Sequence, residues 1–249
     1  MMFEEKLSSL SSAGLNQTDE YCCHAAGMMS NSASKPELFL IINFFEHIPP
    51  PPSFPSFKAG FMHVVKVVQK HPQFIEGMLL RDVNETPRFP YINFAVFDTG
   101  PRGIFQHDPD WIQAISEGHG TEQIHHQAGF MELQTLHGPE TPSLPKIPPN
   151  KTTAYIITAF KAEGDFDRLD RTWNTWSGSD FIQAYIPPEL SLKRITIHKR
   201  IVTHGTFVYA LMCELSEGVT YLNRARDFIE RLNERNCGYS ALYLIDEIY

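Results

Sequence analysis

The sequence repeats one order of expected elements, strand–helix–strand–strand–helix–strand, and the second copy begins about 115 residues after the first. The apolar strands expected at Leu38–Phe45, Tyr91–Phe97 and Gly129–Leu136 return as Ala154–Phe160, Phe207–Cys213 and Tyr239–Ile245. A repeated element order is typical of two copies of one supersecondary unit, so it constrains the architecture more than any single residue does. We therefore predict two βαββαβ units, at residues 37–137 and 152–249.

Local signals delimit the first unit. Leu38–Phe45 is a continuous apolar run of strand length, as is typical of a strand that is covered on both faces. Apolar residues then recur at helical spacing from Ser56 to Val68, and Asp108 followed by Pro109 is a typical start of a second, short helix. The remaining strands are expected at Gly77–Asn84, Tyr91–Thr99 and Gly129–His137.

The second unit follows a proline-rich joint. Residues 138–151 contain five prolines and are predicted to be a linker. Strands are then expected at Thr153–Ala162, Leu192–Val202, Phe207–Leu215 and Tyr239–Tyr249, with helices at Asp165–Trp176, continuing to Tyr185, and at Thr220–Glu234. Residues 1–36 are rich in serine and lack apolar periodicity, so they are predicted to be a disordered leader.

Composition excludes several classes of function. The chain has 249 residues, is 42% hydrophobic and has a formal net charge of −8, so nucleic acid is not an expected partner. No apolar stretch reaches the length of about 18 residues that a membrane span requires. The four cysteines match neither a disulfide framework nor a zinc spacing, which favours reduced thiols and a cytoplasmic location.

The βαββαβ order predicts the α+β fold class. Such a unit is ferredoxin-like: an antiparallel four-stranded sheet has both helices on one face and leaves the other face uncovered. Two units in one chain can pack these uncovered faces together. We therefore expect two tandem ferredoxin-like units whose antiparallel sheets form an intramolecular pseudo-dimeric barrel.

The sequence also resembles a known superfamily. The stretch Phe74–Arg81, followed by Arg88–Phe97 and then a helix, is similar to the antibiotic-biosynthesis-monooxygenase-like families of the dimeric α+β barrel superfamily. The resemblance implies a pocket between sheet and helices that holds a flat aromatic or polyketide-like substrate. It also implies an oxygenation in which the substrate itself supplies the electrons, so we expect neither a cofactor nor a metal.

Three residues of the first unit are candidates for catalysis under this resemblance. Related haem-degrading enzymes use an Asn on the first strand, with a Trp and a His on the second helix. Asn43, Trp111 and His119 occupy similar places here, although Gly118 and the following glycine argue against a helical His119. Asn43 is unusual in its own right, because an amide inside an apolar strand must find hydrogen-bond partners. The second unit has Ala159 at the position expected to correspond to Asn43.

The second unit contributes candidate substrate contacts. Trp173 and Trp176 are three residues apart on an expected helix and can form an aromatic wall or cover the sheet. His198 shares a strand face with Thr196 and Arg200, a face that lies inside if the barrel closes. Two further histidines, His125 and His126, lie with His119 in the expected loop Glu117–Gln127, where solvent exposure is favoured over metal binding.

Three functions follow as hypotheses. The first is a cofactor-independent monooxygenase that acts on a small aromatic or polyketide-like molecule, at a pocket reached by Asn43 and Trp111. The second is a non-catalytic ligand-binding or structural pseudo-dimer. The third is a haem-binding or haem-degrading enzyme. Haem degradation would use Asn43, Trp111 and His119, whereas a haem enzyme that resembles the chlorite-dismutase group requires an axial histidine on a helix of the second unit, and none is found there. We expect a small molecule as partner and leave homo-oligomer formation open.

Overall fold

The computed structural model describes residues 38–98, 109–137, 145–202, 205–235 and 238–249. The first half of the chain contains β1 (Phe39–His47), α2 (Phe57–Val68), β2 (Phe74–Asp82), β3 (Tyr91–Phe97), α4 (Pro109–His119) and β4 (Ile124–His137). The second half contains β5 (Ala154–Phe160), α5 (Phe166–Arg171), α6 (Trp173–Trp176), α7 (Ser179–Tyr185), the 3₁₀ helix η2 (Pro188–Leu190), β6 (Leu192–Arg200), β7 (Tyr209–Leu215), α8 (Leu222–Asn233) and β8 (Tyr239–Ile248). The expected leader, residues 1–36, and the first half of the expected linker lie outside the described residues.

The strands close into one barrel in the order β1-β3-β2-β8-β5-β7-β6-β4, and all neighbouring strands are antiparallel. Within this ring the first half runs β4-β1-β3-β2 and the second half runs β8-β5-β7-β6. The halves meet where β2 pairs with β8 and where β4 pairs with β6. The predicted closure of antiparallel strands into a barrel within one chain is confirmed.

Alternate residues of the strands fill the inside of the barrel. Leu40, Ile42 and Phe44 of β1 belong to the same apolar cluster as Tyr155 and Ile157 of β5. Since strands repeat their side-chain direction every second residue, the residues between these face outward. Both halves therefore shield their inner faces in one shared core.

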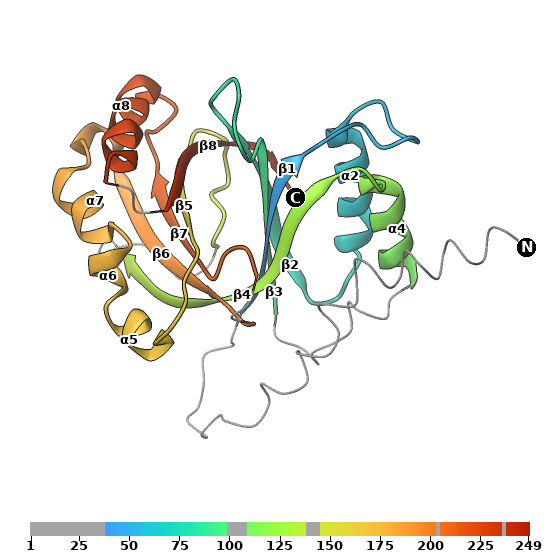
Figure 1. Ribbon diagram of the computed structural model, residues 1–249. Coiled ribbons are helices and arrows are strands. Elements are labelled where there is room, and N and C mark those ends of the chain that lie inside the picture. Colours follow the sequence, from blue (N-terminus) through green and yellow to red (C-terminus); the bar gives the residue numbers. More distant parts are fainter. Residues whose placement is uncertain (1–37, 99–108, 138–144, 203–204, 236–237) are drawn as a thin grey trace, which may run out of the picture.

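Helices cover the outside of the barrel in two groups, with α2 and α4 on one side and α5 to α8 on the other (Figure 1). Helix α2 begins as predicted after Ser56, whose hydroxyl accepts a hydrogen bond from the Ala59 N–H at 3.1 Å. Helices α2 and α4 cross with their backbones in contact, because a Cβ on Gly60 would lie 2.2 Å from the carbonyl oxygen of Gly118. This close crossing fixes the end of α4 against the sheet.

The prediction of one long helix from Asp165 to Tyr185 is wrong, since the chain forms α5, α6 and α7 instead. The hydroxyl of Thr172 donates to the carbonyl of Arg168 at 2.9 Å at the first break. Gly178, with φ of 84°, makes the second break in the left-handed region that favours glycine. Among the described residues, no helix has the length and hydropathy that crossing a bilayer requires.

The loop expected at Glu117–Gln127 is also different in the structure. Helix α4 continues to His119, and β4 already begins at Ile124. His125 and His126 pair with β1, and these ladder hydrogen bonds outweigh the polar composition of the segment. Both histidines therefore lie on a strand and not in an exposed loop.

Candidate functional site

Asn43 lies on the outer face of β1, in the layer between the barrel and helices α2 and α4. Only 2% of its surface is exposed, and it stands opposite Asn93 of β3 in the strand register. Its Oδ1 lies 3.2 Å from Nδ1 of His125 on β4. Because an amide oxygen only accepts hydrogen bonds, His125 donates from Nδ1 and keeps Nε2 as an acceptor when the ring is neutral.

His119, at the end of α4, is brought next to this pair. Its ring lies 5.5 Å from the ring of His125, 5.5 Å from that of Phe45 and 6.4 Å from that of Phe61, between centroids. The ring is 6% exposed, and its Nδ1 is buried without a hydrogen-bond partner. A buried polar atom without a well-formed hydrogen bond is costly, and the nearby side chain of Gln123, whose Oε1 is also buried without a hydrogen bond, interacts with this ring.

Both histidines are held neutral. Burial, followed by the nearby His125, lowers the pKa of His119 from 6.5 to about 3. Burial, followed by the nearby His126, lowers the pKa of His125. A neutral imidazole keeps one free lone pair, so each ring can accept a proton from a group that approaches it.

Tyr249 extends this polar group from the other side. Its hydroxyl donates a hydrogen bond to Oδ1 of Asn93, which stands opposite Asn43. We refer to Asn43, Asn93, His119, His125 and Tyr249 together as the polar stripe. Aromatic side chains border it: Phe45, Phe57, Phe61 and Tyr91. The stripe therefore combines neutral bases and amides with an apolar, largely water-excluding surrounding.

Trp111 lies in the same layer but in a separate apolar cluster. Its ring lies 6.4 Å from that of Phe97, and it packs with Ile41 and Val64. It also borders an open groove of about 320 Å³ between α2 and α4, where Nε2 of His63 lies 3.1 Å from the carboxylate of Glu117. The structure thus brings Asn43 and His119 together through His125, and places Trp111 in the same layer but in a separate apolar cluster.

The three candidates of the second half are not brought together. Trp173 is buried and its Nε1 donates to the side-chain oxygen of Gln134 at 2.8 Å. Trp176 packs edge-on against Phe160 and donates from Nε1 to the carbonyl of Leu169 at 2.9 Å. Both lie on the outer side of the barrel. His198 projects inside it, so the sheet separates the histidine from both tryptophans.

His198 lines a small cavity inside the barrel. The cavity, of about 20 Å³, is also bordered by Tyr155 and Met212, and the hydroxyl of Tyr155 is buried without a partner. Burial lowers the pKa of His198 to about 4, although the nearby Glu132 opposes this shift. A space of this size accommodates about one water molecule, so the cavity is too small for an organic substrate.

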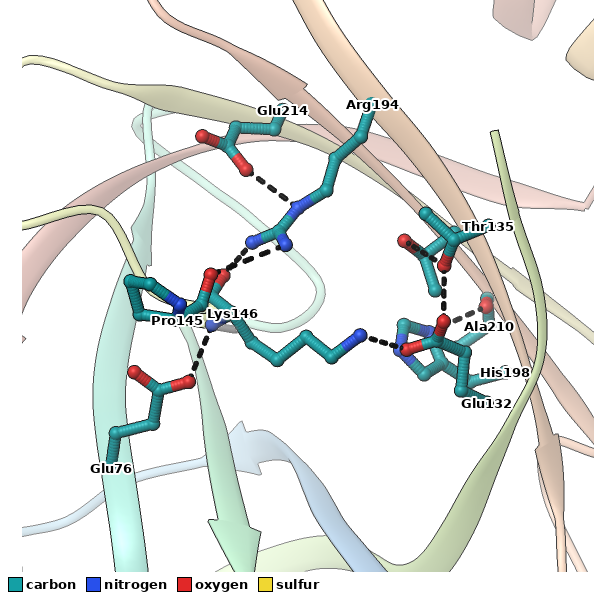
Figure 2. Close-up of polar contacts among 10 residues, drawn as sticks. Glu76, Glu132, Thr135, Pro145, Lys146, Arg194, His198, Ala210 and Glu214 are labelled. Atoms are coloured by element: carbon teal, nitrogen blue, oxygen red, sulfur yellow. Dashed lines mark hydrogen bonds and ion pairs between the residues drawn. The ribbon is translucent and has the colours of Figure 1, made fainter. Parts of the chain in front are cut away.

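Beside this cavity, a residue of the expected linker enters the barrel (Figure 2). The ammonium of Lys146 donates to Glu132, its backbone N–H donates to Glu76 at 2.6 Å, and its carbonyl accepts from Arg194. Nε of Arg194 in turn lies 2.7 Å from the carboxylate of Glu214. Burial raises the pKa of Glu132, but the hydrogen bonds from Lys146 and Thr135 outweigh burial and lower it overall. Because the charges are paired, this network fixes the linker in place.

The residue that corresponds to Asn43 in the second half is not Ala159. Ala159 belongs to the cluster inside the barrel, whereas Asn43 faces outward. The outward-facing neighbour is Thr158, whose hydroxyl lies 2.8 Å from that of Ser240 on β8. The alternation of strand faces explains the shift by one residue. The outer layers of the two halves therefore carry different polar chemistry.

The site residues were partly visible in the sequence. Asn93 lies in the apolar strand Tyr91–Phe97 and carries the same signal as Asn43, a lone amide among buried side chains. His125 and Tyr249 gave no such signal, because their positions depend on strand pairing far along the chain. His126 binds Glu46 at 2.9 Å, and no group of three metal-ligating side chains occurs within the described ranges.

Comparison with known proteins gives distant structural likenesses. A candidate monooxygenase of Fusobacterium nucleatum subsp. nucleatum shares 12% identity, with 86% of this chain and 95% of that chain covered and a TM-score of 0.49. An anthrone oxidase-like protein shares 11% identity over 88% and 95% of the two chains, with a TM-score of 0.46. Chlorite dismutase of Candidatus Nitrospira defluvii shares 12% identity over 86% and 93%, also with a TM-score of 0.46.

Sequence comparison gives one family. No curated protein matches the chain. Residues 74–245 match the family described as a domain of unknown function (DUF7153), a range that runs from β2 to β8 and includes three of the five stripe residues. The chain belongs to this family.

Proposed function

We propose that the protein is a small-molecule enzyme, a cofactor-independent monooxygenase of an aromatic or polyketide-like substrate, with its site at the polar stripe. The observation that carries this proposal is the buried ring of His119, whose Nδ1 makes no well-formed hydrogen bond, beside His125, which Asn43 holds by a hydrogen bond. Unsatisfied buried polar atoms are rare in folded proteins, and a catalytic role is one of the explanations for them. Four of the five stripe residues belong to the first half, and the fifth, Tyr249, follows β8 of the second half.

The chemistry follows from a neutral, desolvated base. His119 accepts a proton from an activated carbon or hydroxyl of the substrate, and the resulting anion stabilises the imidazolium that forms beside it. The electron-rich anion reduces O₂. One oxygen atom enters the product as a carbonyl oxygen, and the other leaves as water together with two substrate hydrogens. Asn43 is a positioning residue in this scheme, because its carbonyl oxygen fixes the orientation and tautomer of His125.

The proposal includes the internal organisation of the chain. We take residues 37–137 and 152–249 as two tandem ferredoxin-like units of the dimeric α+β barrel superfamily, joined by residues 138–151. The support is that each half repeats one strand order, β4-β1-β3-β2 and β8-β5-β7-β6. The differing residues Asn43 and Thr158 on the outer faces favour one active unit and one unit that completes the barrel.

Oxygen uptake tests this function. Purified protein is incubated with anthrone-type and quinol-type substrates, and oxygen consumption is followed with an electrode. We expect turnover by the wild type and a loss of about 100-fold or more in kcat for His119→Phe, since a positioned base typically contributes that much. Tyr185→Ala, a change at a side chain that is 60% exposed, is the matched control and should keep full activity. No uptake above the uncatalysed rate across the panel contradicts the proposal.

A second candidate function is a non-catalytic pseudo-dimer. The observation that favours it is the dense aromatic packing around the stripe, where the rings of Phe45 and Phe57 lie 4.9 Å apart and those of Phe57 and Tyr91 lie 5.0 Å apart. In this case His119 only fills space. His119→Phe then raises stability and alters no activity or ligand binding. A haem enzyme with an axial histidine on the second half gains no observation, because helices α5 to α8 carry no histidine to serve as that ligand.

A further inference from the structure

The ring of Tyr249 packs against β2 and its neighbours through contacts of the kind that hold an aromatic ligand. It lies flat against Phe74, with centroids 5.8 Å apart and planes inclined by 9°, and it meets the ring of Phe61 edge-on at 6.0 Å. Its hydroxyl donates to Oδ1 of Asn93. Two aromatic contacts and one polar anchor are the elements by which a protein selects a phenol ring.

Gly77 makes room for this ring. A Cβ at Gly77 would lie 2.1 Å from a ring carbon of Tyr249, so any larger residue would occupy the place of the ring. The backbone does not need a glycine for its conformation, since Gly77 lies within β2 and is absent from the residues with positive φ. Glycine in a strand interior often marks the close approach of another group. The position is therefore kept free of a side chain for the ring above it.

The ring can leave without loss of the strand pairing. Gly77 and Tyr249 exchange two backbone hydrogen bonds, of 2.7 and 2.8 Å, which do not involve the side chain. Tyr249 as a whole residue is only partly buried, whereas its hydroxyl lies in the interior of the layer, where burial raises its pKa. Rotation of one side chain thus exposes the surface between Phe61 and Phe74, and this surface ends at Asn93, opposite Asn43.

We propose that the surface over Gly77, bounded by Phe61, Phe74 and Asn93, is a binding slot for a hydroxylated aromatic ring, and that Tyr249 closes it as an internal occupant. The slot deepens the proposed function, because it places a phenolic ring with its oxygen at the polar stripe. Binding is measured without turnover, so failure of the slot and failure of the monooxygenase activity are distinguishable.

The test uses p-cresol, which is the side chain of tyrosine as a free molecule, in calorimetric titrations of the full chain. Tyr249→Ala should bind p-cresol at least about tenfold more tightly than the wild type, because the internal ring no longer competes. Toluene, which has the same shape and no hydroxyl, should bind about three- to tenfold more weakly than p-cresol. Tyr249→Val is measured in parallel and replaces Tyr249→Ala if the smaller side chain prevents folding.

A second pair of variants locates the slot. Gly77→Ala placed in the Tyr249→Ala background puts a methyl group where the ring lay, so p-cresol binding should fall to the wild-type level. Asn93→Leu in the same background should abolish the preference for p-cresol over toluene. Unchanged p-cresol binding after Gly77→Ala, or equal binding of toluene and p-cresol to Tyr249→Ala, overturns the proposal. Tyr185→Ala serves as the control for loss of a tyrosine elsewhere and should bind as the wild type does.

Discussion

Nδ1 of His125 donates a hydrogen bond of 3.2 Å to the side-chain oxygen of Asn43, and this bond joins two strands from opposite ends of the first half. Both residues lie under α2 and α4, where Asn43 is fully buried and His125 is half-buried. If one side chain is removed, the other remains buried with an unsatisfied polar atom, which costs about 1–3 kcal/mol. The bond therefore matters for stability as well as for the orientation of His125.

A double-mutant cycle measures this bond. Asn43→Ala and His125→Ala should each lower the free energy of unfolding, and the double variant should lose less than the sum of the two. We expect a coupling energy of about 0.5–1.5 kcal/mol from urea unfolding, the usual range for one hydrogen bond. Additive losses would show that the two side chains do not interact in solution.

The low pKa of His119 predicts acid sensitivity. The unfolded chain binds a proton near pH 6.5, whereas folded His119 accepts one only near pH 3, so unfolding takes up a proton between these values. The free energy of unfolding must then fall as the pH falls below 6.5, by about 1.4 kcal/mol per pH unit for one histidine. His198, with a pKa of about 4, adds the same dependence down to pH 4.

The corresponding measurement is urea unfolding of the wild type and His119→Phe at several pH values between 4.5 and 7.5. The free energy of unfolding of the variant should change with pH less steeply, by the equivalent of one proton. The variant should therefore become increasingly more stable than the wild type toward pH 4.5. Ile124→Ala, at a side chain that is 51% exposed and carries no titratable group, is the control and should leave the slope unchanged. Parallel curves for wild type and His119→Phe would show that His119 titrates normally in the folded protein.

The ion pair of Lys146 and Glu132 predicts that removal of one partner lowers the free energy of unfolding more than replacement of both partners does. Lys146→Ala leaves the largely buried carboxylate of Glu132 without its partner and should cost about 3–5 kcal/mol. Lys146→Met combined with Glu132→Gln should recover most of this loss, because no charge then remains unpaired. Lys151→Ala, at a side chain that is 49% exposed, should cost less than about 1 kcal/mol. Equal losses for the two lysines would place Lys146 at the surface.

The sequence allowed the barrel to be predicted because its strands are apolar runs such as β1 and β5, and because their order repeats. Asn43 was identified because a lone amide in such a run is unusual, and Asn93 could have been found by the same rule. The placement of Tyr249 over Gly77 depends on the pairing of β2 with β8, a contact between distant segments that no local pattern encodes. The insertion of Lys146 into the core could not be predicted either, since a proline-rich segment indicates a linker.

The most direct test of the account compares the two halves at one equivalent position. Asn43→Leu and Thr158→Val each remove an outward-facing polar side chain at an equivalent position. Asn43 is the fifth residue of β1 that pairs with β3, and Thr158 is the fifth residue of β5 that pairs with β7. Oxygen uptake with the best substrate of the panel is measured for both variants. We predict a loss of about 100-fold for Asn43→Leu, through misplacement of His125, and unchanged activity for Thr158→Val. Equal effects of the two changes, or an active Asn43→Leu, would contradict a single site at the polar stripe of the first half.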